Sequence, residues 1–150
     1  MVTLDYYTSV GHILELLAQS DYHARQTTGD YFRVEVLPAL RCGQTRLFFR
    51  DDGRPSAVIT WAWLSEDVER DVLSSGRALR HDEWRSGTRL FFNDWITPYG
   101  NIREVVHEMT HVQFPDEVAT SLRRNPDGSV RRVNRWTGAH VRKIKDEVTA

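Results

Sequence analysis

Residues 44–63, QTRLFFRDDGRPSAVITWAW, decide the fold of this chain. The runs at residues 44–50 and 56–63 are rich in aromatic and β-branched side chains, which favour strands. Between them, Asp51-Asp52-Gly53-Arg54-Pro55 supplies the acidic, glycine and proline residues that are typical of a turn. The stretch therefore predicts a β-hairpin.

Helical patterns precede the hairpin. Apolar residues at helical spacing predict a helix over residues 6–18. Ser20-Asp21 can cap a short second turn that carries His23. Residues 34–40 are apolar but contain Pro38, so they predict either a strand end or a short helix.

Helices and strands alternate after the hairpin. Ser65, Asn101 and Pro115 predict the starts of helices that reach residues 73, 112 and 124. Strands are expected over residues 88–96 and 129–134, followed by a helical basic tail. This order predicts an α+β fold with an antiparallel-rich central sheet flanked by helices, in a single domain of residues 1–150.

The composition restricts the class of protein. Of the 150 residues, 40% are hydrophobic and 27% are charged, which is typical of a globular chain and excludes a largely disordered one. No apolar run approaches the ~20 residues of a membrane helix, and we expect no signal peptide. Cys42 is the only cysteine, so an intrachain disulfide is excluded. A cytoplasmic protein without a membrane span is expected.

Basic residues concentrate near the C-terminus. Residues 121–150 contain eight arginines or lysines and three acidic residues. This segment is either a solvated basic face or a docking patch for an acidic macromolecule. It is short for a nucleic-acid site, and we expect no nucleic acid as a partner.

Asp94 is the first candidate for chemistry. In the strand over residues 88–96, alternation places Leu90, Phe92, Asp94 and Ile96 on one face. Both faces are largely apolar, so the strand is expected to be central. A carboxylate there needs a partner, because its burial alone is costly. Asp94 either accepts hydrogen bonds from a loop backbone or orients a histidine.

His23 is the natural candidate for that histidine, although the sequence alone does not select it among six.

The segment His107-Glu108-Met109-Thr110-His111 also matches H-E-x-x-H, a zinc-binding helix motif. A catalytic zinc needs a third protein ligand, and no suitable one follows before Pro115. We therefore favour a solvated helix face and expect no metal. The five tryptophans are either core residues or the lining of a channel with apolar walls.

Segments spread over residues 10–138 resemble, in the same order, the motifs of one family. They are Ser20-Asp21-Tyr22-His23 (S-x-x-H), Val36-Leu37-Pro38-Ala39-Leu40-Arg41 (V-L-P-A-I-R), Arg50-Asp51-Asp52-Gly53-Arg54-Pro55 (the hairpin turn), Trp61-Ala62-Trp63-Leu64-Ser65 (W-A-x-L-S), Ser86-Gly87-Thr88 (S-G-D), Asp94-Trp95-Ile96-Thr97-Pro98-Tyr99-Gly100 (D-W-I-A-P-F-G) and Phe114-Pro115-Asp116-Glu117 (F-P-D-E). Together these motifs are specific, whereas no single one is. The chain resembles the toxin-activating lysine acyltransferases, which convert RTX protoxins to active toxins.

The resemblance implies a fold similar to the GNAT acetyltransferases and a cytoplasmic site of action. It implies no bound cofactor, because the acyl donor is an acyl carrier protein with its acyl-phosphopantetheine. Carried over residue by residue, it makes His23 the catalytic histidine, Asp94 the catalytic aspartate and Ser20 a functionally important serine. Carrier proteins of this kind are acidic, so the basic segment is expected to dock the carrier through Arg131, Arg132 and Arg135.

We therefore expect a protein-lysine fatty acyltransferase that acts on an internal lysine of a protein acceptor, with an RTX-type protoxin as one candidate. A lysine amine has a pKa near ~10.4 and must lose a proton before it attacks, so His23 is expected to be the general base. Two alternatives are a zinc-dependent hydrolase that uses the H-E-x-x-H segment and a non-catalytic binding module on the same fold. A homodimer, the acyl chain length and the acceptor are left open.

Overall fold

The computed structural model describes residues 4–25 and 28–149. These residues form a five-stranded sheet in the order β1-β2-β3-β4-β5. The strands are β1 (Thr45–Phe49), β2 (Pro55–Leu64), β3 (Arg89–Ile96), β4 (Val118–Arg124) and β5 (Val130–Thr137). β1 and β2 form the predicted antiparallel hairpin, and β3 is the predicted central strand.

The sheet is mixed, because β3 and β4 are parallel while the other neighbouring strands are antiparallel. This corrects the expectation of an antiparallel-rich sheet. The sequence predicts a helix over residues 115–124, whereas Val118–Arg124 is a strand with Ala119, Thr120 and Ser121 buried. Packing between two strands overrides the helix-start signal of Pro115. The long helical crossover from β3 permits the parallel pairing.

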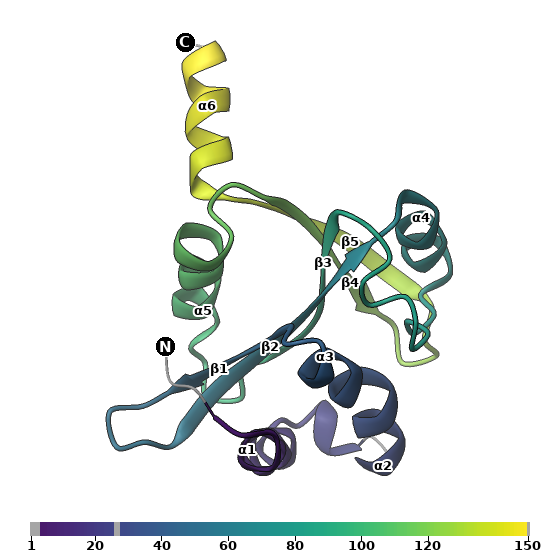
Figure 1. Cartoon of the computed structure of the whole chain (residues 1–150), viewed down its shortest axis with the longest axis vertical. Coiled ribbons are helices and arrows are strands. Elements are labelled where there is room, and N and C mark those ends of the chain that lie inside the picture. The colour runs from purple at the N-terminus through teal and green to yellow at the C-terminus, as the bar shows by residue number, and fades with distance from the viewer. Residues whose placement is uncertain (1–3, 26–27, 150) are drawn as a thin grey trace.

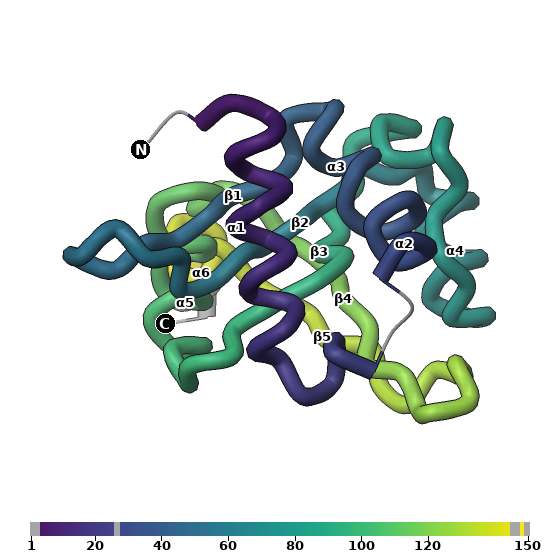
Figure 2. Tube along the Cα trace, turned by 90° about the horizontal axis from the view of Figure 1, so that it is seen from below, coloured from purple at the N-terminus to yellow at the C-terminus, as the bar shows by residue number. Residues whose placement is uncertain are grey.

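Helices cover both faces of the sheet (Figure 1). One face carries α1 (Tyr6–Gln19), α2 (Thr28–Tyr31), α3 (Leu37–Arg41) and α4 (Glu66–Ser75), and Figure 2 shows α1 lying across the β1–β3 part of the sheet. The opposite face carries α5 (Ile102–Glu108) and the π-helical turn η3 (Met109–Gln113). The final helix, α6 (Ala139–Thr149), extends away from the sheet. Within residues 4–25 and 28–149, none of the helices has the length and apolar character needed to cross a lipid bilayer.

Two short turns lie between α1 and α3 along the chain. They are the 3₁₀ turn η1 (His23–Arg25) and the π-helical turn η2 (Phe32–Val36). The segment over residues 34–40, for which the sequence allows a strand end or a short helix, is therefore helical. On this face Ile96 packs with Ile13 and Val36, whereas Phe92 packs with Met109 on the face of α5. The end of α1 leads directly into η1, which begins at His23.

β3 contains a bulge at Asn93. Thr60 of β2 lies opposite Asp94, and the next residue, Trp61, lies opposite Phe92. Asn93 therefore has no partner on β2. An extra residue of this kind reverses the alternation of side chains along the strand.

The bulge changes the face on which Asp94 lies. Regular alternation predicts Asp94 on the same face as Phe92. Instead Trp95 packs with Phe92 on the face of α5, and Ile96 packs on the face of α1. Asp94 lies opposite Thr60 and shares the face of α1. Pairing of β3 with β4 also ends at Phe92, so the two strands part where the bulge begins.

Candidate active site

The end of α1 places Ser20 and His23 side by side. The backbone N–H of Ser20 donates to the carbonyl oxygens of Leu16 and Leu17, which closes the helix. The N–H of Ala24 donates to the carbonyl oxygen of Ser20 at 2.8 Å, so the chain turns at once into η1. The S-x-x-H spacing thus brings both side chains to the inside of one tight turn.

Hydrogen bonds join Ser20, His23 and Asp94 in a line. Ser20 Oγ lies 2.6 Å from His23 Nδ1, and His23 Nε2 lies 3.1 Å from Oδ1 and 3.2 Å from Oδ2 of Asp94. An ionised carboxylate can only accept hydrogen bonds, so Nε2 carries the ring proton and donates a hydrogen bond to Asp94. The lone pair of Nδ1 then faces the Ser20 hydroxyl. A histidine held by a carboxylate in this way is arranged as a general base.

The histidine is shielded, and the aspartate is partly open to solvent. The side chains of His23 and Asp94 are 7% and 20% exposed. The rings of Tyr22 and Tyr31 pack edge-on against the imidazole, with centroids 5.0 and 5.6 Å away. Asp94 Oδ1 also accepts the N–H of Trp95 at 2.9 Å, which fixes the carboxylate on the bulge. Both partners are therefore held in defined orientations.

Sequence reasoning does not identify Tyr31 or Asn93 as parts of this site. The hydroxyl of Tyr31 is buried and has no hydrogen-bond partner among the residues that the structure describes. No local pattern marks Tyr31, because its contact with His23 depends on how residues 28–36 fold back onto α1. Asn93 could have been suspected only from its position directly before Asp94.

The three arginines predicted to bind the carrier do not share one face of β5. Arg132 lies opposite Arg123 of β4, whereas Arg135 lies opposite Thr120, whose hydroxyl donates to Glu69 of α4. Arg131 falls at a register shift between β4 and β5. All three arginines are exposed, and among the described residues none of them forms an ion pair. The structure thus groups Arg132 with Arg123 and separates both from Arg135.

The H-E-x-x-H segment presents its histidines on an exposed helix face. The rings of His107 and His111 stack with centroids 3.9 Å apart, and His111 Nδ1 lies 3.0 Å from the carbonyl oxygen of His107. Glu108 instead accepts a hydrogen bond from Arg46 at 2.6 Å, which ties α5 to β1. In the part of the chain that the structure covers, no three His, Cys, Asp or Glu side chains gather where they could hold a metal ion.

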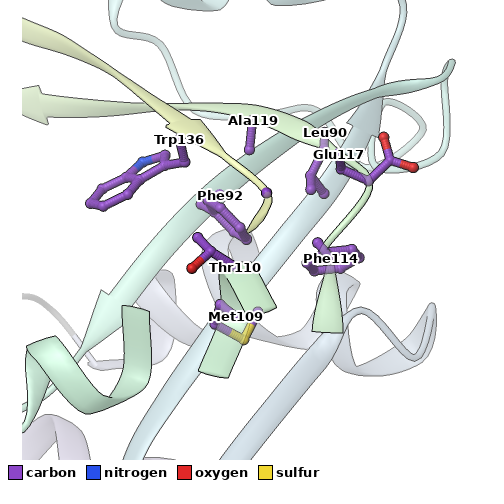
Figure 3. A pocket seen from close by; sticks show the side chains of 9 residues that line it. Leu90, Phe92, Met109, Thr110, Phe114, Glu117, Ala119 and Trp136 are labelled. Carbon is purple, nitrogen blue, oxygen red and sulfur yellow. The ribbon is translucent and has the colours of Figure 1, made fainter. Parts of the chain in front are cut away.

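Aromatic side chains fill the face of α5. Phe92, Phe114 and Trp136 line a pocket there (Figure 3) whose free volume is ≈ 0 Å³, too small to hold a water. Beyond Phe114, a more open hollow of about 560 Å³ lies against Trp61 and Trp63. The rings around Phe92 are therefore core residues, whereas Trp61 and Trp63 also line an open surface.

Comparisons with known proteins identify the family of this chain. The model of the RTX toxin acyltransferase family matches residues 2–137. The chain is 34% identical over 134 residues to the protein-lysine myristoyltransferase HlyC of Escherichia coli, which covers 89% of this chain and 77% of that relative. It is 33% identical over 137 residues to the leukotoxin-activating lysine-acyltransferase LtxC of Aggregatibacter actinomycetemcomitans, with 91% and 80% covered. It is 31% identical over 105 residues to the lysine-acyltransferase RtxC of Vibrio cholerae, with 70% and 68% covered.

The matched region runs from α1 through β5, so it contains Ser20, His23 and Asp94. A family match over nearly the whole chain is stronger than any of the short motifs that first indicated it. The chain therefore belongs to the RTX toxin acyltransferase family and is an acyltransferase, as its motifs predicted.

Proposed function

We propose that this enzyme transfers a fatty acyl group from an acyl carrier protein to the side-chain amine of an internal lysine in a protein acceptor. Relatives named as lysine acyltransferases support lysine as the acceptor residue. The observation that carries the mechanism is the 3.1 Å contact between His23 Nε2 and Asp94, with Ser20 on the other ring nitrogen.

His23 is the general base of the proposed reaction. The target lysine is an ammonium at neutral pH and must lose a proton before its nitrogen can attack the thioester carbonyl. Because Nδ1 faces Ser20, the proton reaches Nδ1 through the Ser20 hydroxyl or after that hydroxyl has moved aside. Asp94 accepts the Nε2–H bond throughout and stabilises the imidazolium that forms.

The transfer exchanges one bond for another at the acyl carbon. The lysine nitrogen forms the amide C–N bond, and the C–S bond to the phosphopantetheine breaks. The imidazolium of His23 returns a proton to the leaving sulfur, so the carrier departs as a free thiol. Over the whole reaction the lysine ammonium loses two protons, of which one ends on the thiol and one in solvent.

The carrier docks on strands β4 and β5, which form one edge of the sheet. Arg123 and Arg132 are exposed and lie directly opposite each other, and like charges in this position repel unless an anion lies between or above them. An acidic carrier helix or its phosphodiester supplies such an anion. This pair supports docking better than the predicted trio, because Arg131 falls at the register shift and Arg135 faces α4.

The fold class, the place of action and the acceptor are proposed from the family. The fold is of the GNAT-like acyltransferase kind, a proposal supported by a mixed sheet whose parallel strands β3 and β4 part beside Asp94. The protein acts in the cytoplasm, and an RTX-type protoxin is the first acceptor to test, since relatives are named for toxin activation.

The function is tested by intact mass spectrometry of an RTX-type protoxin incubated with the enzyme and acyl-loaded carrier protein. We expect the protoxin mass to rise by one acyl group per modified lysine, and peptide mapping to place the group on a lysine side chain. An unchanged protoxin mass, with intact carrier binding, would instead indicate a non-catalytic binding module.

A further inference from the structure

We propose that Glu35 is a positioning residue for Asp94 and acts through the bulge residue Asn93. Asn93 Nδ2 donates to Glu35 Oε2 at 2.7 Å in a partly buried contact. Asn93 has no partner on β2, so pairing with β2 does not hold the backbone of β3 at Asn93. The bond to Glu35 replaces that missing restraint. The catalytic meaning of the proposal rests on the proposed role of Asp94.

The bulge determines whether Asp94 can reach His23. Without the extra residue, Asp94 would share the face of Phe92, which is the face of α5. With it, the carboxylate lies on the face of α1 and contacts His23. A group that stabilises the bulge therefore controls the orientation of Asp94, although it touches neither the substrate nor His23.

The segment that carries Glu35 also contacts the histidine. Tyr31 precedes Glu35 by four residues, and its ring packs edge-on against His23 at 5.6 Å. Glu35 lies on the π-helical turn η2, whose Phe32 and Val36 are buried against α1 and β3. Neighbouring residues of one anchored segment thus contact His23 directly and, through Asn93, the bulge that carries Asp94. Turns of this kind are often found at functional sites.

A charged acceptor suits this position. A hydrogen bond to an ionised group is shorter and stronger than one between neutral groups, and this bond is partly shielded from water. Glutamine offers a neutral acceptor of the same shape, whereas alanine offers none. The two substitutions at residue 35 therefore separate the loss of the charge alone from the loss of the hydrogen-bond acceptor.

The test compares Glu35→Ala, Glu35→Gln and the control Asp30→Ala, whose ion pair with Arg33 is exposed. We expect Glu35→Ala to lower kcat of acyl transfer by about 10-fold or more, with KM for carrier and acceptor within about 2-fold. Glu35→Gln should recover most of the activity, and Asp30→Ala should match the wild type.

Nitrogen-15 NMR of the His23 side chain supplies a second readout that does not depend on turnover. In Glu35→Ala, the Nε2 resonance should move in the same direction as in Asp94→Asn, whereas in Asp30→Ala it should stay in place. The proposal is overturned if Glu35→Ala keeps the wild-type kcat, if Glu35→Gln recovers nothing, or if the Nε2 resonance does not move. Because this resonance reports geometry, it separates failure of the positioning role from failure of the proposed function.

Discussion

Nε2 of His23 lies 3.1 Å from Oδ1 of Asp94, although 71 positions separate the two residues in the sequence. Two local irregularities produce this contact. The tight turn after α1 brings His23 to the face of the sheet that α1 covers. The bulge at Asn93 turns Asp94 toward His23. A regular helix end or a regular strand would place either side chain elsewhere.

Ser20→Ala should lower kcat less than His23→Ala does. The Ser20 hydroxyl lies 2.6 Å from Nδ1. In the proposed mechanism Ser20 orients the ring, whereas His23 itself accepts the proton. We expect a loss of about 10-fold for Ser20→Ala and of about 10²-fold or more for His23→Ala. Single-turnover rates measure both. Equal losses would contradict an auxiliary role and would give Ser20 a direct part in bond formation.

The double variant Arg123→Glu/Arg132→Glu should weaken recognition of the acyl carrier. Opposite charges mainly raise association rates and set the docking register, so we expect KM for the carrier to rise several-fold with a smaller change in kcat. The salt dependence of the rate should also flatten. Arg135→Glu is the matched control, because this arginine lies on the other face of β5. An equal effect of Arg135→Glu would point to general charge rather than to a docking face.

The pair of Glu83 and Arg77 should make stability depend on pH. Hydrogen bonds from the Arg77 guanidinium lower the pKa of Glu83 from its ordinary value of 4.5, and the Arg80 backbone N–H contributes further. The pair therefore stabilises the fold above that ordinary value, and its contribution is lost as the pH falls through the lowered pKa. Glu83→Gln should cost about 1–3 kcal/mol at neutral pH.

Urea unfolding of the wild type and Glu83→Gln at about pH 7 and about pH 3 measures this effect. The difference in unfolding free energy should shrink in acid. Glu66→Gln is the control, because Glu66 is 68% exposed and its ion pairs are long. A difference for Glu83→Gln that is the same at both pH values would contradict the assignment.

The double variant His107→Ala/His111→Ala should leave acyl transfer within a few-fold of the wild type. The two rings are exposed and stack on each other, and neither contacts the Ser20–His23–Asp94 line. Initial rates with and without added zinc measure the effect. The prediction fails if chelation abolishes acyl transfer by the wild type, added zinc restores it, and added zinc does not restore activity to the variant. That result would make His107 and His111 zinc ligands.

The sequence predicts the elements whose signals are local. The turn chemistry at residues 51–55 predicts the β1–β2 hairpin, and helical spacing predicts α1. The S-x-x-H motif and the isolated carboxylate in an apolar strand mark His23 and Asp94 as candidates. These signals depend on the residues themselves and on their immediate neighbours.

Features that depend on tertiary pairing are not predicted. Val118–Arg124 is a strand because it fits between β3 and β5, which no local pattern reports. The bulge at Asn93 arises from the register of β2 against β3, so alternation alone placed Asp94 on the wrong face. The separation of Arg132 from Arg135 likewise follows from strand register, although the sequence places these residues close together.

In the proposed mechanism, Asp94 acts on the reaction through the charge it presents to His23. Asp94→Asn keeps the shape of the side chain and removes that charge. The decisive measurement is kcat and the carrier KM for acyl transfer by this variant, with folding checked by circular dichroism. We predict that kcat falls by about 10²-fold or more while KM stays within a few-fold. A wild-type kcat, or a loss confined to KM, would show that the charge of Asp94 takes no part in the transfer.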